Sequence, residues 1–162
     1  MTAKDAVRFS LNMSRGIIDD YTRDLDDADL LVRPVAGMNH IAWQLGHLIE
    51  SERSMVGALG HAMPELPAGF EAAHTRETAG SDDPRPFATC AVYMQLMDKV
   101  RAGTLAALDA TPEAELDKPG PESMRAYAPT VGAVFMTVAN HALMHCGQFV
   151  AVRRLRGKSI AI

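Results

Sequence analysis

The sequence has only two cysteines among its 162 residues, so it cannot carry the disulfide framework that staples many small secreted domains. Cys90 and Cys146 both fall within apolar stretches with helical spacing. A thiol in such a place is usually a small buried hydrophobic group. We therefore expect two buried free thiols and no disulfide.

Positive charge is also scarce. The chain has 16 Lys and Arg against 20 Asp and Glu, which gives a formal net charge of −4 at pH 7. Proteins that bind nucleic acid along its backbone need a basic surface, so we expect no nucleic-acid partner. One basic cluster, residues 153–158, follows the last helical pattern, where cations complement the helix dipole. We interpret it as a capped, solvated helix end, with a phosphate or nucleic-acid contact as the alternative.

Long hydrophobic runs are missing as well. The longest apolar run, residues 131–139, is far shorter than the roughly 20 residues that a membrane-spanning helix needs. Residues 1–5 do not resemble the start of a signal peptide. The sequence therefore predicts a soluble, cytoplasmic protein with no membrane partner.

Helical periodicity is the main pattern that the sequence does contain, and no strand pattern competes with it. Four long amphipathic segments cover residues 3–25, 39–60, 86–108 and 131–155. Four such helices predict an all-α protein, a four-helix bundle formed by a single domain over residues 1–162. The long irregular segments between them allow crossover connections, so spacing alone leaves the order of the helices open.

Some details of these helices can also be predicted. Asn39 is a good N-cap residue for the second helix. In the third helix, the spacing of the apolar residues predicts that Val92, Leu96, Val100 and Ala107 face the core.

Three histidines are the most informative residues. His141 and His145 lie four residues apart, so both project from the apolar face of the last helix. If the helix that carries His47 packs against it, a third imidazole completes a metal site with one open coordination position. Because the spacing is a common one, hydrogen-bonded core histidines are the alternative. We expect the remaining histidines to face solvent or a pocket rim: His40, His61 and His74.

Polar neighbours of the three histidines are candidate orienting residues. Gln44 and Glu50 lie three residues before and after His47, and either could orient its ring. Gln148 could do the same for His145. Ordinary polar residues of helix surfaces are the alternative interpretation for each.

Four further residues are weaker candidates for a pocket. Trp43 is one turn from His47 and could form a pocket wall, although a core aromatic is the simpler interpretation. Phe70 lies in the long irregular segment and could belong to a lid. Arg125 and Tyr127 precede the last helix and could contact an anionic substrate.

Two motifs resemble the DinB-like superfamily. Residues 39–48, Asn-His-Ile-Ala-Trp-Gln-Leu-Gly-His-Leu, are similar to the second helix of that family. Residues 140–148, with a His-x-x-x-His pair and a following Gly-Gln, are similar to its last helix. The resemblance covers most of the chain and implies a DinB/YfiT-like bundle of up-down-down-up topology, often a homodimer. It also implies a divalent metal, commonly zinc or nickel, on His47, His141 and His145.

The chemistry of such a centre leaves three functions open. A divalent ion either lowers the pKa of bound water, as in a hydrolase, or binds a thiolate. Relatives in the superfamily include bacillithiol- and mycothiol-dependent enzymes, so the resemblance favours a thiol-dependent S-transferase or isomerase. Its partners would be a small-molecule substrate and a low-molecular-weight thiol as co-substrate. A non-catalytic metal-binding stress or interaction protein is the third possibility, and the catalytic residues stay unknown.

Overall fold

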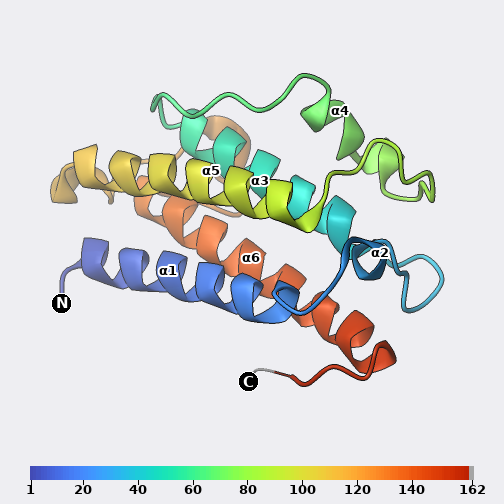
Figure 1. The fold of residues 1–162 in the computed structure, drawn as a ribbon. Coiled ribbons are helices and arrows are strands. Elements are labelled where there is room, and N and C mark those ends of the chain that lie inside the picture. The colour runs from blue at the N-terminus through green and yellow to red at the C-terminus, as the bar shows by residue number, and fades with distance from the viewer. Residues whose placement is uncertain (161–162) are drawn as a thin grey trace.

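The computed structural model describes residues 1–160, and the secondary-structure elements in that range are all helices (Figure 1). The four long helices are α1 (Ala3–Thr22), α3 (Ile41–Gly57), α5 (Cys90–Ala110) and α6 (Val131–Leu155). Short helical turns join them: α2 (Asp27–Leu30), α4 (Phe70–Ala73), η1 (Arg76–Thr78), η2 (Glu113–Glu115) and η3 (Glu122–Met124). Within residues 1–160, no helix is both long and apolar enough to cross a membrane.

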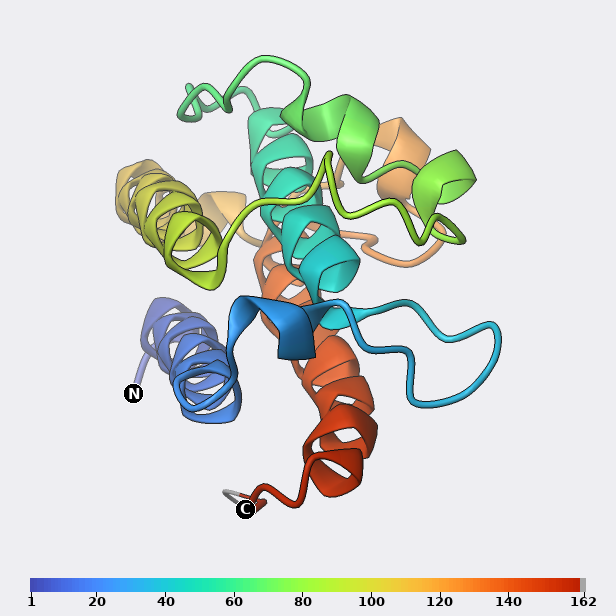
Figure 2. The ribbon, with the colours of Figure 1, turned by 45° about the vertical axis from the view of Figure 1, so that its right-hand side comes forward.

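The long helices form a bundle of up-down-down-up order. Helices α1 and α6 run in one direction, and α3 and α5 run in the other (Figures 1 and 2). Each of α1 and α3 packs against both α5 and α6. Because α3 and α5 are parallel, residues 58–89 must return along the full length of a helix of about 25 Å. The predicted four-helix bundle is therefore confirmed, and so is the topology that the family resemblance implied.

The helix ends differ from the predicted ends for local reasons. Helix α3 is capped by His40 rather than Asn39, because the His40 side chain accepts a hydrogen bond from the backbone N–H of Trp43. Helix α1 ends at Thr22, since the chain turns there toward α2, which Asp26 caps. Helix α5 starts at Cys90 rather than residue 86, because Thr89 is its N-cap.

Of the four positions of α5 that were predicted to face the core, two are buried and Leu96 is half-buried, but the predicted register was wrong at the start of the helix. Val92 is exposed, while Tyr93 and Met97 are buried. Val100 and Ala107 are buried as predicted. The inward stripe of α5 therefore begins with the aromatic Tyr93, which takes the place that the sequence pattern gave to Val92.

The basic cluster at the end of α6 is not simply solvated. Arg153 is only 2% exposed and donates hydrogen bonds to the carbonyl of Tyr21 and the carboxylate of Asp24. Arg156 pairs with Asp29. Acidic residues around the α1–α2 connection thus neutralise part of this cluster and attach the end of α6 to the first helix.

His40 should make the stability of the metal-free protein depend on pH. It was predicted to face solvent or a pocket rim, but it is 1% exposed. Burial, with a smaller contribution from Arg33, lowers its pKa to about 4. The pKa of His40 is lower in the folded state than its unfolded value of about 6.5. Its contribution to the stability of the folded state is therefore complete above a pH of about 6.5 and is lost as the pH falls toward 4. His40→Asn keeps an N-cap acceptor and removes this titration. Between pH 7 and 5, with chelator present, its melting temperature should fall less than that of wild type, and equal falls would contradict this role.

Candidate metal centre

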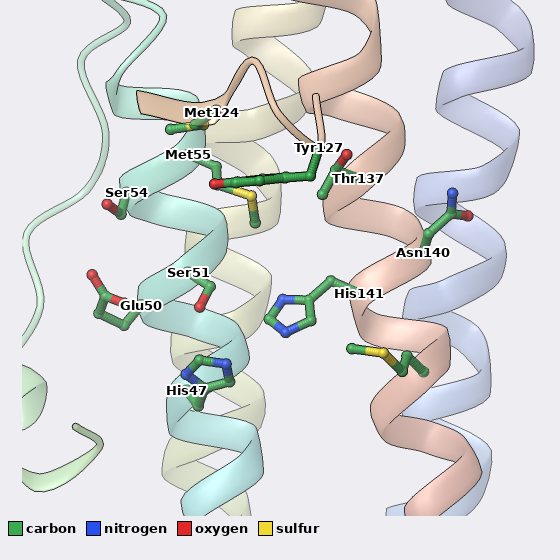
Figure 3. Close-up of a pocket in the computed structure, with 11 residues that line it drawn as sticks. His47, Glu50, Ser51, Ser54, Met55, Met124, Tyr127, Thr137, Asn140 and His141 are labelled. Atoms are coloured by element: carbon green, nitrogen blue, oxygen red, sulfur yellow. The ribbon is translucent and has the colours of Figure 1, made fainter. Parts of the chain in front are cut away.

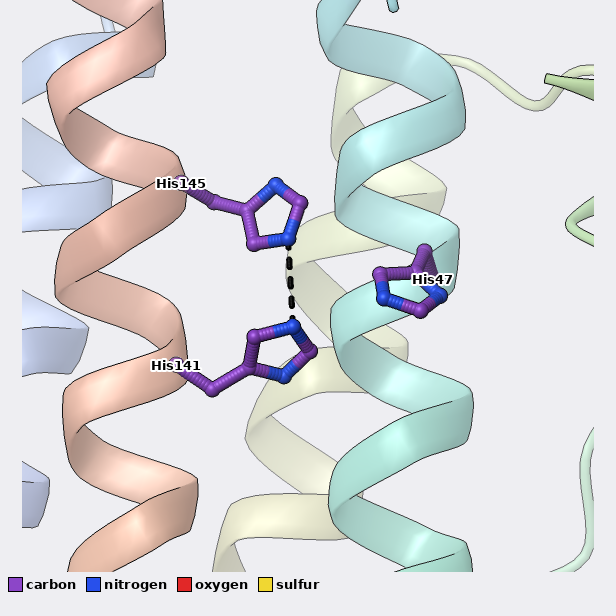
Figure 4. A group of neighbouring side chains, drawn as sticks. All are labelled: His47, His141 and His145. Atoms are coloured by element: carbon purple, nitrogen blue, oxygen red, sulfur yellow. Dashed lines mark hydrogen bonds between the residues drawn. The ribbon is translucent and has the colours of Figure 1, made fainter. Parts of the chain in front are cut away.

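Three imidazoles meet between α3 and α6, which lie side by side (Figure 4). His47 projects from α3, while His141 and His145 project from successive turns of α6. One ring nitrogen of each lies within 4.8 Å of the others. The structure therefore brings together the three histidines that the sequence singled out.

The spacing of the two histidine nitrogens on α6 fits a shared metal ion. The Nε2 atoms of His141 and His145 are 3.1 Å apart. Two ligands bound to one ion at about 2.0–2.1 Å, at tetrahedral or right angles, lie about 2.8–3.4 Å apart. All three donors are imidazole nitrogens, which suit zinc, nickel and other first-row divalent ions. The residues present therefore fit the metal that the family resemblance implied.

Gln44 fixes the orientation of His145. The Nε2 of Gln44 donates to the carbonyl of Asn39 at 2.7 Å, which turns its Oε1 toward the histidine. The Nδ1–H of His145 donates to that Oε1 at 2.8 Å, so the lone pair is on Nε2, the atom that faces His141. The prediction that Gln44 orients His47 was wrong: it orients His145, the candidate ligand on the neighbouring helix.

Removal of this hydrogen bond should weaken metal binding. Metal-ligating histidines usually donate their second N–H to a fixed acceptor, whose loss costs about 10–100-fold in affinity. We expect a loss of that size in Gln44→Ala, measured by competition with a zinc chelator. Gln148→Ala is the matched control, because Gln148 makes no hydrogen bond to His145 within residues 1–160. Equal affinities in the two variants would exclude a positioning role for Gln44.

Burial keeps the three rings neutral. It lowers the pKa of His141 and of His145 to about 4, with a smaller contribution from neighbouring imidazoles, and it also lowers the pKa of His47. A histidine must be deprotonated to bind a metal. The cluster is therefore ready to bind an ion at neutral pH without first releasing protons.

A pocket of about 580 Å³ opens on the side of the cluster formed by His47 and His141 (Figure 3). His145 is only 6% exposed and lies deeper. The rest of the lining comprises five polar residues and four larger, partly apolar ones: Glu50, Ser51, Ser54, Thr137, Asn140, Met55, Met124, Tyr127 and Met144. A small molecule in this pocket would lie beside two of the three imidazoles.

Several weaker candidates lie elsewhere than predicted. Phe70 is buried against the ring of His74, which is itself 4% exposed, so Phe70 belongs to the core. Arg125 donates to the carbonyl of Gly120 and does not line the pocket, whereas Tyr127 does. His61 is half-buried and lies 3.2 Å from the Thr111 hydroxyl.

Sequence reasoning missed part of the pocket. Thr137 lies four residues before His141, so helical periodicity could have placed it on the same face of the helix. Met124 belongs to the turn η3, and no local pattern signals its position. Glu50 lines the pocket, and burial, together with the charge of Glu71, raises its pKa.

Comparisons with known proteins agree with this architecture. The family model described as "DinB superfamily" matches residues 10–149, a range that includes all three histidines. A solved structure, "Crystal structure of the conserved protein of locus from Enterococcus faecalis", is similar with a TM-score of 0.73 and 18% identity. The similarity covers 98% of this chain and 99% of that one, and at this identity it concerns the fold alone. No curated protein matches the chain.

Proposed function

We propose, from the premise that this chain belongs to the DinB superfamily, that it is a divalent-metal-dependent enzyme that transfers a low-molecular-weight thiol to a small electrophile. Transfer, or isomerisation through a transient thiol adduct, would occur in the pocket beside His47 and His141. The observation that carries the proposal is the meeting of three neutral imidazoles, two of which line a pocket large enough for a small molecule.

The expected chemistry follows from the donor set. His47, His141 and His145 would hold zinc or nickel as three neutral ligands, and the charge of the ion would favour the thiolate over the thiol at neutral pH. The sulfur would form a bond to an electrophilic carbon, and the leaving group would depart with the bonding electrons. Glu50 is the ionisable pocket residue nearest in sequence to His47. Its carboxylate could receive the thiol proton, because its raised pKa lies closer to neutral pH and makes it a better base.

The charge of the pocket indicates which thiols fit. Among the described residues that line it, Glu50 has the only carboxylate, and no Lys or Arg is present. A thiol with several carboxylates, such as glutathione or bacillithiol, would have no cationic side chain in this lining to pair with. A neutral, hydroxyl-rich thiol such as mycothiol could instead use the hydroxyl and amide groups of Ser51, Thr137 and Asn140.

A thiol screen tests the proposal. Zinc- or nickel-loaded protein is incubated with an electrophile panel and each of the three thiols, and thioether products are measured by mass spectrometry, with His141→Ala as the control. We expect product with wild type only, and most with the neutral thiol. Glu50→Gln removes the carboxylate from the pocket and should reduce the ratio of product formed with the neutral thiol to product formed with the carboxylated thiols. Metal-loaded protein that consumes no thiol would exclude the transferase.

Metal-dependent hydrolysis is the second candidate, and Glu50 favours it. A carboxylate of raised pKa near the imidazoles could act as the general base for water. The same protein assayed with ester and amide substrates distinguishes the two activities. About one bound ion per chain with neither activity would favour the non-catalytic metal-binding protein.

A further inference from the structure

Trp43 lies between His47 and a strap, residues 70–78, which contains α4 and η1. Its indole stacks on the imidazole of His47 with a centroid distance of 4.9 Å and an interplanar angle of 9°. On its other edge, Nε1–H donates to the carbonyl of Thr75 at 3.0 Å and lies 3.3 Å from the hydroxyl of Thr78. Trp43 is 6% exposed. The strap therefore holds the ring on which His47 rests.

The strap is itself docked at the residue before His47. A Cβ at Gly46 would overlap the ring of His74, so the close approach of the strap to α3 requires glycine there. The Nδ1–H of His74 donates to the carbonyl of Phe70 at 2.7 Å, and the hydroxyl of Tyr93 donates to its Nε2 at 2.9 Å. Both nitrogens of this buried ring are thus satisfied, which fixes the strap on α3 and α5.

The ring of His47 is held differently from that of His145. His145 is oriented by its hydrogen bond to Gln44, whereas no hydrogen bond within residues 1–160 involves a ring nitrogen of His47. Its ring also contacts the rings of His141 and His145, but Trp43 is the residue that stacks parallel to it. Stacking on the indole therefore opposes rotation of the His47 ring out of the plane parallel to Trp43.

We propose that Trp43 is a positioning residue that sets the ring plane of His47 for metal binding. Because Trp43 is attached to the strap, docking of the strap and binding of the metal stabilise each other. This inference rests on the metal site of the proposed function, but it requires no catalytic activity. Residues 70–78 would thus affect metal affinity although none of them is a candidate ligand.

Zinc affinity in two Trp43 variants tests this role. Trp43→Leu removes the flat ring and should lower the affinity by about 10–100-fold, the usual cost of losing an orienting partner. Trp43→Phe keeps a flat ring and should recover most of that loss. Phe135→Leu is the control, because Phe135 is a buried aromatic residue in a hydrophobic cluster that does not include Trp43. It should lower the melting temperature and leave the affinity of the folded protein unchanged.

Amide hydrogen exchange provides a second measurement that a merely structural role would not change. Zinc should slow exchange in residues 70–78 of wild type severalfold, and should do so less in Trp43→Phe, which lacks the bond to Thr75. This comparison decides the question if Trp43→Leu does not fold. In wild type, quenching of Trp43 fluorescence reports the binding of Co²⁺ directly, because Trp43 is the only tryptophan.

The outcomes separate this inference from the proposed function. If wild type binds zinc, and the Trp43 variants have the same affinity and the same slowing of hydrogen exchange in residues 70–78, only the positioning role is overturned. If wild type binds neither zinc nor nickel, both ideas fail together. Reduced affinity in Trp43→Leu with recovery in Trp43→Phe supports the positioning role, whether or not the protein proves to be an enzyme.

Discussion

His141→Ala is expected to lower the affinity for zinc or nickel by more than about 100-fold, because loss of a ligand costs more than loss of its orienting partner. Metal content should fall from about one ion per chain to nearly none. His141 is half-buried at the pocket wall, so its truncation should disturb the fold only modestly. Mass spectrometry of protein purified without a His tag measures the metal content.

His61→Ala is the matched control for this variant. His61 is also half-buried, but its ring lies beside Thr111 and is not part of the cluster. It should keep its metal. Unchanged metal content in His47→Ala, His141→Ala and His145→Ala together would exclude the site, and circular dichroism would show whether each variant has kept its helices.

The parts of this architecture that follow from local rules could be predicted from the sequence. The i, i+4 spacing places His141 and His145 on one helix face whatever surrounds them, and the apolar stripe directs that face inward. The family resemblance supplied the helix order, which spacing alone had left open. Whether the three histidines bind a metal stays a prediction, and so does the homodimer, which light scattering can test.

The parts that depend on distant contacts could not be predicted. Gln44 bonds His145 across 101 positions, and nothing beside Gln44 indicates that partner. His74 is buried because it meets Gly46 and Tyr93, both far away in the sequence. In each case a polar residue that looks like a surface residue in sequence has its partner on another element of the fold.

A buried ion pair beneath the candidate metal centre is another contact of this kind. Arg101 of α5 forms two hydrogen bonds with the carboxylate of Glu52 of α3, at 2.7 and 2.9 Å, and it also donates to the carbonyl of Leu11 in α1. The two charged residues are 5% and 6% exposed. They line one small cavity together with His141. The pair thus joins three helices directly behind one of the candidate ligands.

Arg101→Met should lower the free energy of unfolding by about 3–5 kcal/mol, because it leaves the carboxylate of Glu52 buried without a counter-charge. The double variant Glu52→Leu/Arg101→Met removes both charges and should recover most of the loss. Urea unfolding with chelator present measures both. Arg8→Met, which breaks the exposed pair with Asp109, is the control and should cost less than about 1 kcal/mol. Because the double variant keeps all three histidines, it should bind zinc as wild type does. Weak binding by a stable double variant would instead mean that the ion pair acts on the metal centre itself.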